Sequence, residues 1–276
     1  MTPSLPIAAC VNDLSGIGRA SLTVAIPVLS VMGVQCCPLP TAILSAQTGC
    51  DHYSFVDFTP HMHEYFAKWQ EEGVTFDALY TGFLGSEEQI AIVRDIVSQK
   101  PDAAWVLVDP VMADHGRMYA TYTEAMCRGM RDLVRIADIV TPNITEACLL
   151  TDSPYMGETL SARAARSLCE NVAALGPNTV VLTGIRIDEH RIGSGLYEAA
   201  HHRFTLIEKE LSAGHYPGTG DLFASVLCGA LLRGAHVAQA VDKAAGFVAR
   251  VTSYTAAAGT DPKYGVLLEH CLKELI

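Results

Sequence analysis

Short apolar runs alternate with longer segments of helical period along most of the chain. The apolar runs have the length of buried strands, and the segments between them repeat their apolar positions every three to four residues. Strands that alternate with helices in this way indicate βαβ units and a mainly parallel sheet. Because such crossovers are right-handed, the helices should cover both faces of the sheet. We expect strands at 5–12, 78–81, 104–109, 138–141 and 179–183.

Two segments interrupt this alternation. Residues 34–58 are rich in Thr, Gly, Tyr and β-branched residues without a clear helical period, so we expect a small β flap beside the sheet. Residues 193–208 alternate like a hairpin, and the Ala-, Val- and Leu-rich stretch 220–258 predicts two helices separated near Gly234. With no linker and no internal repeat, the chain 1–276 is expected to form one α/β domain.

The composition is that of a globular protein. Half of the 276 residues are apolar and 18% are charged, which is far from the low-hydrophobicity, high-charge signature of a disordered chain. The net charge of −11 and the lack of a basic run argue against binding to nucleic acid or to an anionic membrane, because both need clustered Lys and Arg.

The cysteines and the start of the chain lead us to expect a cytoplasmic protein. The nine cysteines are scattered without C-x-x-C spacing, which indicates buried free thiols in a reducing compartment. Cys36 and Cys37 would point to opposite faces of a strand, so packing is favoured over a redox or metal site. The start has no positively charged segment ahead of an apolar one, and no run approaches the ~20 apolar residues of a membrane span.

A glycine-rich turn directly before an apolar helix is the most informative motif. It consists of Gly218, Thr219, Gly220 and Asp221. Glycines let the backbone approach a ligand closely, and a helix that begins here directs its free N–H groups and positive dipole end toward an anion. An Asp in the first turn could take a proton from an attacking hydroxyl. The alternative is that Gly220 and Asp221 only start a helix, because Asp is favoured there.

Polar residues also follow two of the predicted strands. Asp109 ends the run 104–109, at the edge where parallel strands bind ligands, and could organise Mg²⁺ beside a polyphosphate. It could equally end the strand in an Asp-Pro turn. Asn143 and Glu146 share one face of the helix that follows 138–141, from which they could reach a hydrated metal. Their spacing is also that of a capping box, which is the favoured interpretation of this pair alone.

Several enzyme motifs are missing from the sequence. There is no G-x-x-x-x-G-K-[ST] loop, and Ser21 stands where a dinucleotide fingerprint beginning at Gly16 needs its third glycine. No H-E-x-x-H or G-x-S-x-G motif occurs. Two histidine pairs lack a cysteine or carboxylate at useful spacing and are expected at the surface: His61 with His63, and His201 with His202.

The order of the motifs along the chain resembles that of the ribokinase-like superfamily. The motifs are D-P-V-M (109–112), T-P-N-x-x-E (141–146), V-L-T-G (181–184) and G-T-G-D (218–221). More closely, the sequence resembles the pyridoxal kinase (pyridoxamine kinase) family from about Ile7 to the C-terminus. The joint occurrence of the four motifs in this order is far more specific than any one of them. The resemblance implies a central, mainly parallel sheet with helices on both faces and a small β flap.

The resemblance assigns the parts of a phosphoryl-transfer site. Asp221 matches the base that activates the substrate hydroxyl, and residues 218–220 match the anion hole. Asp109, Asn143 and Glu146 match positions around Mg²⁺ and the ATP phosphates. Among these three, Asp109 and Glu146 are the expected metal ligands.

Two more groups of residues match nucleotide contacts. Thr183 and Gly184 lie where relatives place residues near the nucleotide. Residues 114–119 match a loop that covers ATP in relatives, so the resemblance implies that Arg117 or Tyr119 closes over phosphate. Arg117 could equally be a solvated loop charge.

Three positions match contacts to the vitamin ring. The resemblance implies that Asp13 or Thr48 hydrogen-bonds the ring substituents and that Phe83 packs on the pyridine. Some relatives carry Ser in place of Asp13 and Tyr in place of Phe83, so these contacts transfer less directly than the phosphate site. From the residues alone, Asp13 could cap a turn, Thr48 could sit in a strand and Phe83 could belong to the core.

The activity that the resemblance implies is ATP- and Mg²⁺-dependent phosphorylation of the 5′-hydroxymethyl group of pyridoxal, pyridoxamine or pyridoxine. Members of the family are commonly homodimers, and 34–58 is where a partner subunit is expected. Hydroxymethylpyrimidine (phosphate) kinase shares the fold but usually has Cys in place of Asp221, and sugar kinases typically show G-A-G-D. Intact Asp221, Asp109 and Glu146 argue against a non-catalytic vitamin B6-binding protein.

Overall fold

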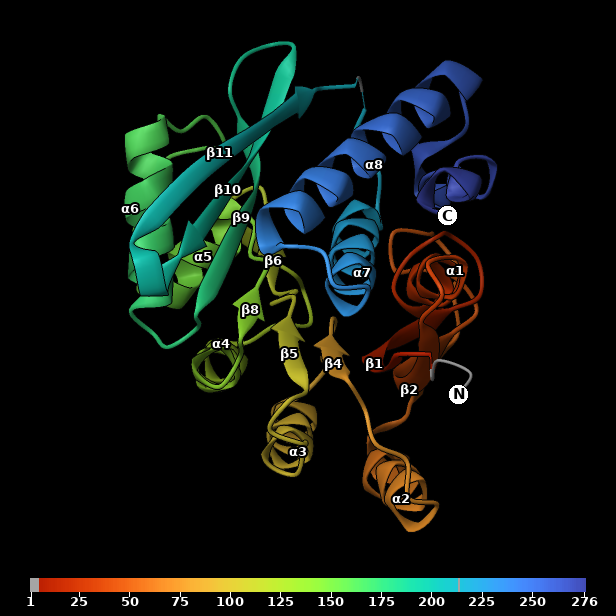
Figure 1. The fold of residues 1–276 in the computed structure, drawn as a ribbon. Helices are drawn as coiled ribbons and strands as arrows, with labels where there is room; N and C mark the ends of the chain where they lie inside the picture. Colours follow the sequence, from red (N-terminus) through yellow and green to blue (C-terminus); the bar gives the residue numbers. More distant parts are fainter. Residues whose placement is uncertain (1–4, 213) are drawn as a thin grey trace.

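A nine-stranded sheet in the order β11-β10-β9-β8-β5-β4-β1-β2-β3 forms the centre of the protein (Figure 1). The computed structural model describes residues 5–212 and 214–276. Neighbouring strands from β9 to β2 pair in parallel, whereas β3, β10 and β11 pair antiparallel at the two edges. The strands are β1 (Ile7–Ser15), β2 (Gln35–Leu44), β3 (Phe55–Asp57), β4 (Ala78–Thr81), β5 (Trp105–Val108), β8 (Ile139–Val140), β9 (Thr179–Arg186), β10 (Arg191–Glu198) and β11 (Arg203–Glu210).

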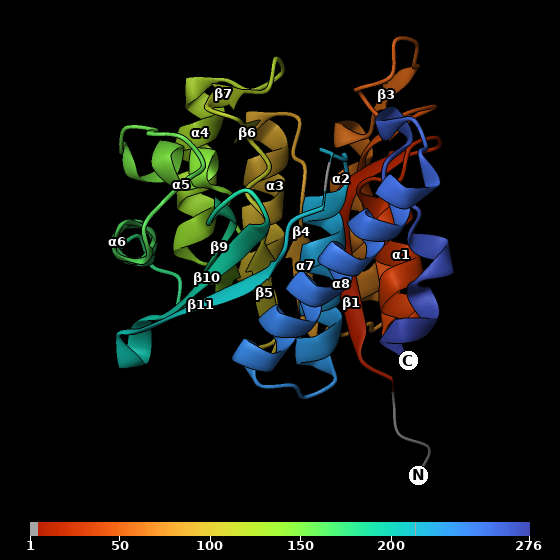
Figure 2. The ribbon, with the colours of Figure 1, turned by 90° about the horizontal axis from the view of Figure 1, so that it is seen from above.

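Helices cover both faces of the sheet, as Figures 1 and 2 show. One face carries α1 (Leu22–Val31), α7 (Thr219–Leu232) and α8 (Val237–Ala258). The other carries α2 (Thr59–Glu71), α3 (Glu87–Ser98), α4 (Glu124–Arg135), α5 (Ile144–Thr151) and α6 (Ala162–Ala173). Short 3₁₀ turns are η1 (Ala199–His201), η2 (Pro262–Tyr264), η3 (Leu268–His270) and η4 (Leu272–Leu275). Within the described ranges, no helix combines the length and the apolar character that crossing a membrane requires.

The central strands are buried on both of their faces. In β1, Ala9 and Val11 belong to the hydrophobic cluster on the α2–α6 side, whereas Ala8 and Cys10 belong to the cluster on the α1, α7 and α8 side. Successive side chains of a strand point to opposite faces, so a strand between two helical layers needs apolar residues at every position. This requirement explains why the strands are continuous apolar runs in the sequence.

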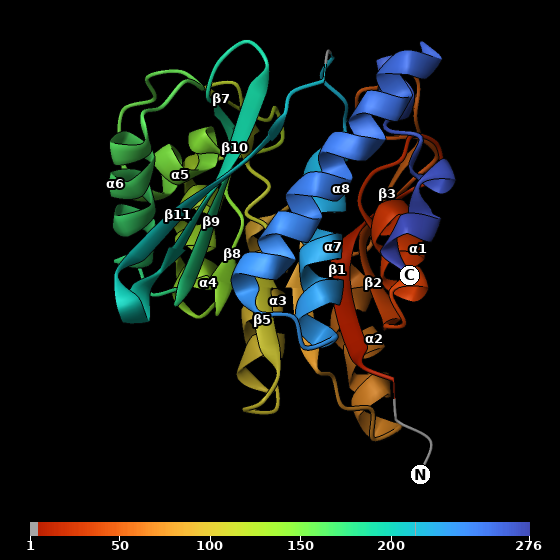
Figure 3. The ribbon, with the colours of Figure 1, turned by 45° about the horizontal axis from the view of Figure 1, so that its top comes forward.

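The predicted alternation of strands and helices is present, and the edges show the differences. β4 occupies the predicted residues, β10 and β11 form the predicted hairpin, and Figure 3 shows the two C-terminal helices α7 and α8 packed together. β1 runs past its predicted end at Asn12, because Leu14 and Ser15 still pair with β2.

The segment 34–58 is only partly the flap that the sequence predicts. Its first half is β2, which is a member of the sheet and pairs in parallel with β1. Its second half is a loop and the edge strand β3, and these project at one end of the molecule in Figure 2. Pro38 and Pro40 lie inside β2, and proline is unusual in a strand that is not at an edge.

The carboxyl ends of the parallel strands bring polar residues to one edge of the sheet. Asn12 and Asp13 lie in the last part of β1, the loop with Phe83 follows β4, and Asp109 follows β5 directly. The N-terminus of α7 lies at the same edge, since Asn12 contacts Asp221 in its first turn. This edge is where open α/β sheets bind ligands.

Gln89 of α3 connects the β2–β3 end of the sheet to the loop that follows β4. The residue is 2% exposed, and its Nε2 donates to the carbonyl of Thr41 (2.9 Å) and to the hydroxyl of Thr59 (2.7 Å). Its Oε1 accepts the backbone N–H of Gly85 (2.7 Å). The Thr41 hydroxyl donates to the carbonyl of Phe83 (3.1 Å), so this network also holds the loop that carries Phe83.

Replacing Gln89 by Met should lower the free energy of unfolding by about 1–3 kcal/mol. Met keeps the size of the side chain but leaves the partly buried N–H of Gly85 without its acceptor, and it removes one of the two donors to the carbonyl of Thr41. Denaturant unfolding measures this change. Gln70→Met, at an exposed position of α2, is the matched control and should stay within about 0.5 kcal/mol of the parent. Equal losses in the two variants would contradict the role of Gln89.

Candidate active site

Asp221 lies in the first turn of α7, directly after a glycine that fixes the start of the helix. The N-cap residue Gly218 has φ 81°, a left-handed conformation that glycine adopts readily. A Cβ on Gly218 would lie 2.0 Å from the carbonyl oxygen of Arg19, so the backbone passes here only with glycine. The first N–H groups of a helix have no partner within it, and those of α7 lie where the sequence predicts an anion cradle, at residues 218–220 beside Asp221.

Asn12 holds the carboxylate of Asp221 in place. The residue is 1% exposed, and its Nδ2 donates to Oδ1 of Asp221 (3.0 Å). Its Oδ1 accepts the backbone N–H groups of Asp13 (3.0 Å) and Phe83 (2.8 Å). A Cβ on Gly82 would lie 2.2 Å from Nδ2 of Asn12, so glycine is required beside this amide. One side chain therefore joins β1, the loop after β4 and the start of α7.

Two serines engage the buried carboxylate of Asp13. The hydroxyl of Ser15 donates to Oδ2 (2.7 Å) and that of Ser21 donates to Oδ1 (2.5 Å). Burial raises the pKa of Asp13, and the two hydroxyls partly oppose this effect. Ser21 has φ 55° and ψ −128°, which is strained for a residue with a side chain, and its backbone N–H stabilises the charged form of Asp221. Ser21 thus bridges the two carboxylates.

Asp109 and Asp221 form a pair of acidic groups, of which Asp109 is buried and Asp221 is half-buried. Burial raises the pKa of Asp221 to about 6, against the stabilising N–H of Ser21 and the amide of Asn12. Burial and then the charge of Asp221 raise the pKa of Asp109 to about 7, while the hydroxyl of Thr141 (3.0 Å from Oδ1) lowers it. A Cβ on Gly220 would lie 3.7 Å from Oδ2 of Asp109, which places this carboxylate beside the cradle.

Asn143 and Glu146 form the capping box that their spacing indicates. Oδ1 of Asn143 accepts the N–H of Glu146 (2.9 Å), and Oε2 of Glu146 accepts the N–H of Asn143 (2.9 Å). Oε1 of Glu146 also accepts the N–H of Met112 (3.1 Å), and Nδ2 of Asn143 donates to the carbonyl of Ala113 (2.8 Å). Burial and the charge of Asp109 raise the pKa of Glu146. The box therefore caps α5 and keeps a buried carboxylate near Asp109.

Mg²⁺ fits the donor set that these residues provide. The buried residues Asp109 and Glu146 and the half-buried Asp221 bring three carboxylates to one edge of the sheet, and each has a raised pKa. Raised values show that negative charge is costly here, and a divalent cation with oxygen ligands lowers that cost. The predicted metal ligands Asp109 and Glu146 are thus placed where a cation is electrostatically favoured.

The residues expected near the nucleotide lie on two segments that contact α5, the helix that carries Glu146. Burial and the charge of Glu146 raise the pKa of the Tyr119 phenol. Arg117 is exposed on β7 (Arg117–Met118), which pairs with β6 (Ala113–Asp114) in a small hairpin at the predicted covering loop. Thr183 and Gly184 lie on β9, beside the start of α5. Their contacts with a nucleotide stay predictions.

The residues expected at the vitamin ring differ in their surroundings. Phe83 is half-buried directly after β4 and is tied to Asn12 by its backbone N–H. Thr48 lies in an exposed turn after β2 and not in a strand. The buried side chain of Gln47 fixes this turn, because its Nε2 donates to the carbonyl of Lys263 (2.8 Å) and its Oε1 accepts the N–H of Gly49 (2.7 Å). The roles of Asp13, Thr48 and Phe83 toward a ring stay predictions.

Sequence reasoning missed Asn12 and Ser21. The available signal for Asn12 was an amide side chain directly after the apolar run 7–11, at the end of the strand where ligands bind. Ser21 entered the sequence analysis only as the residue that breaks a dinucleotide fingerprint. Its strained backbone gives no signal in the sequence.

Comparison with known proteins relates this chain to a family of kinases. The family model described as phosphomethylpyrimidine kinase matches residues 18–265. A Bacteroides thetaiotaomicron protein, named provisionally as a phosphomethylpyrimidine kinase and solved in a form with pyridoxal, is 38% identical with a TM-score of 0.94, and the match covers 99% of this chain and 96% of that one. Pyridoxal kinase from Lactobacillus plantarum is 30% identical with a TM-score of 0.90, and the match covers 99% and 97% of the two chains.

Some curated relatives are named pyrimidine kinases and others pyridoxal kinases. The hydroxymethylpyrimidine/phosphomethylpyrimidine kinase of Haemophilus influenzae is 29% identical over 176 residues, which are 63% of this chain and 64% of the relative. The chain spans about half to two thirds of the length of the curated relatives that it matches. The solved structures confirm the predicted ribokinase-like α/β fold. The chain belongs to the phosphomethylpyrimidine kinase family, in which its relatives include proteins named pyridoxal kinase.

Proposed function

We propose that the protein is an ATP- and Mg²⁺-dependent kinase that phosphorylates the 5′-hydroxymethyl group of pyridoxal, pyridoxamine or pyridoxine. The placement of Asp221 carries this proposal, because Asn12 fixes the carboxylate between the anion cradle at 218–220 and the loop with Phe83. A base and an anion site serve the transfer of a phosphoryl group to a hydroxyl, and an aromatic side chain can pack on the ring that carries this hydroxyl. The Bacteroides relative solved with pyridoxal supports the choice of ring.

Asp221 has the properties of a general base. Its pKa of about 6 leaves it charged at neutral pH and more basic than an ordinary Asp. The hydrogen bond from Asn12 orients its carboxylate, so the base does not need to reorganise when the substrate hydroxyl arrives. A base held in this way takes the proton from the hydroxyl as that oxygen attacks phosphorus.

The start of α7 supplies positive potential for the transferred group. The N–H groups at 218–220 and the helix dipole both point toward negative charge, which in this reaction builds on the phosphoryl oxygens. Asp109 and Glu146 would hold Mg²⁺, whose charge neutralises the polyphosphate. Thr141 and the backbone at Met112 and Asn143 keep these two carboxylates in position.

The assembly and location of the protein belong to the same proposal. All nine cysteines are free, which supports a reducing cytoplasm. The edge strand β3 exposes Phe55 (52%) and Val56 (56%), and an apolar strand edge is a surface that a second copy can cover. We therefore place the interface of a homodimer at 34–58. The continuous sheet supports a single domain.

Hydroxymethylpyrimidine, free or phosphorylated, is the second candidate substrate. The description of the family model and the Haemophilus relative favour it. Its hydroxymethyl group would meet the same base and cradle. Asp221 favours vitamin B6, because the pyrimidine kinases that the motifs resemble usually have Cys at this position.

The choice between these substrates is testable by comparing kcat/KM for pyridoxal, pyridoxamine, pyridoxine and hydroxymethylpyrimidine at saturating ATP and Mg²⁺. We expect the best vitamin B6 form to exceed hydroxymethylpyrimidine by about tenfold or more, which is the discrimination that a few ring contacts provide. The reverse order would assign the pyrimidine activity. No ADP release with any of the four compounds would contradict kinase activity on both rings.

Asp221→Asn should lower the single-turnover rate at saturating substrates by at least ~100-fold, because the amide cannot accept the proton. The Asn Oδ1 still accepts the hydrogen bond from Asn12, so stability at pH 7.5 should not fall. The change also removes a buried charge that is disfavoured above pH 6. In the parent, the rate should rise as pH increases through about 6, where the carboxyl loses its proton.

The control for this variant is Asp95→Asn, which changes an exposed carboxylate on α3. It should keep the parental rate and stability. A rate for Asp221→Asn within about threefold of the parent's, where a base supplies ~10² or more, would show that Asp221 only starts the helix.

Mg²⁺ should stabilise the protein at pH 8 but not at pH 5. Without a cation, groups with raised pKa values stabilise the fold below their unfolded pKa near 4 and lose this contribution as pH rises through the folded pKa, about 7 for Asp109. At pH 8, Mg²⁺ at ten times its Kd should add about 1.4 kcal/mol, or roughly 3–6 °C in Tm. At pH 5 the protonated carboxyls hold the cation poorly.

Thermal unfolding of Asp109→Asn tests the site. This variant should lose the Mg²⁺-dependent rise in Tm at pH 8, whereas Asp95→Asn should keep it. A rise of the same size in Asp109→Asn and the parent would place the cation elsewhere.

A further inference from the structure

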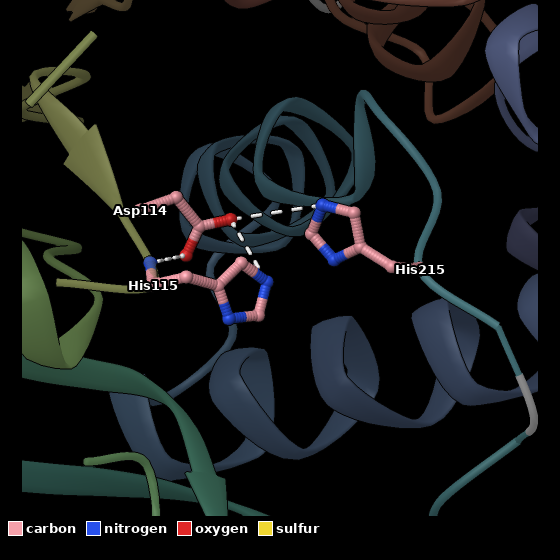
Figure 4. Close-up of side chains that lie close together, drawn as sticks. All are labelled: Asp114, His115 and His215. Carbon is pink, nitrogen blue, oxygen red and sulfur yellow. Dashed lines mark hydrogen bonds and ion pairs between the residues drawn. The ribbon is translucent and has the colours of Figure 1, made fainter. Parts of the chain in front are cut away.

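A cluster of two histidines and one aspartate joins the β6–β7 hairpin to the loop ahead of α7. Asp114 and His115 come from the hairpin, and His215 comes from the loop (Figure 4). Oδ2 of Asp114 lies 3.7 Å from Nε2 of His115 and 3.7 Å from Nε2 of His215. Among the described residues, this is the group of three whose ligand atoms all lie within 4.8 Å of one another.

The spacing of these atoms fits a shared metal ion better than direct hydrogen bonds. A separation of 3.7 Å is longer than a hydrogen bond. Around a tetrahedral ion with bonds of about 2.0–2.1 Å, neighbouring ligand atoms are about 3.3–3.4 Å apart, so small side-chain rotations would close the site. The two imidazole rings lie 4.9 Å apart between centroids at 62°, which lets both direct a nitrogen at the same carboxylate.

Two of the three ligands are already oriented by other groups. Nδ1 of His115 contacts the carboxylate of Glu158, and this contact directs Nε2 toward Asp114 and His215. A carboxylate on the far nitrogen is the arrangement that orients metal-binding histidines in proteins. Oδ1 of Asp114 accepts the backbone N–H of His115 (2.8 Å), which leaves Oδ2 toward both histidines. Groups that would not touch the ion therefore already orient two of its three ligands.

We propose that Asp114, His115 and His215 bind Zn²⁺ or a similar borderline dication, at a site made of different residues from the Mg²⁺ carboxylates. Two imidazoles and one carboxylate are ligands that suit Zn²⁺, whereas Mg²⁺ prefers oxygen alone. The histidine side chains are 55% and 66% exposed, so the ion can enter from solvent and can keep a water or another ligand in its fourth position.

The ion would cross-link two segments that are far apart in the sequence. The hairpin is already tied to α5 on one side, because the N–H of Gly116 donates to the hydroxyl of Thr145 (2.9 Å). His115 lies at the hairpin turn and reaches across to His215, which lies shortly before the cradle at 218–220. A bound ion would therefore hold the hairpin against the loop that leads into α7.

Titration of the full-length protein with Zn²⁺, and with Co²⁺ as a spectroscopic probe, tests this site without any assay of activity. Excess Mg²⁺ occupies the carboxylate site, and a non-thiol reductant keeps the cysteines reduced. The parent should bind one ion that His115→Ala and His215→Ala each fail to bind. Glu158→Gln should weaken this binding by about 10- to 100-fold, since it removes only the orienting carboxylate.

His63→Ala changes an exposed histidine on α2 and should bind like the parent. The Co²⁺ spectrum separates nitrogen and oxygen ligation from thiolate ligation, so binding at cysteine is recognised. Circular dichroism confirms that each variant is folded, and His215→Gln replaces His215→Ala if that variant is not. The proposal is overturned if the parent binds no ion with nitrogen and oxygen ligands, or if the His115 and His215 variants bind as tightly and in the same number as the parent.

Discussion

The candidate site depends on the hydrogen bonds made by the side-chain amide of Asn12. This amide is buried, and it makes one hydrogen bond to the carboxylate of α7 and two to backbone N–H groups of β1 and the loop after β4. Hydrogen bonds are stronger in such an environment, and leaving any of these groups unpaired is costly. The orientation of Asp221 is therefore set from the first strand of the sheet, although α7 carries the residue.

The same edge concentrates negative charge in a protein that is already acidic, with a net charge of −11. Asp13, Asp109 and Glu146 each accept hydrogen bonds from hydroxyl or backbone groups, yet burial still raises the pKa of each. A polyphosphate would add further negative charge. The N-terminus of α7 is one source of positive potential at this edge. A divalent cation at Asp109 would be a second source, next to the first because Gly220 lies beside Asp109.

How much of this structure is predictable depends on how local each signal is. The exact bounds of the strand 78–81 are predictable, because burial on both faces makes it a continuous apolar run. The capping box is predictable because its two residues lie within one helical turn. β2 is not recognisable from the sequence as part of the sheet, since two prolines are unusual within a strand and its partner β1 is separated from it along the sequence. The bond from Asn12 to Asp221 spans 209 positions, so no local pattern contains it.

The long separation between β1 and α7 also has a consequence for synthesis on the ribosome. α7 packs against α1, α8 and β4, and it fills one face of the sheet beside strands that were made much earlier. Until residues 219–232 emerge, the apolar sides of α1 and β4 that they cover stay open to solvent and to other nascent chains. A nascent chain that lacks α7 therefore exposes apolar surface that the finished protein buries, which makes it more prone to aggregation than the complete chain.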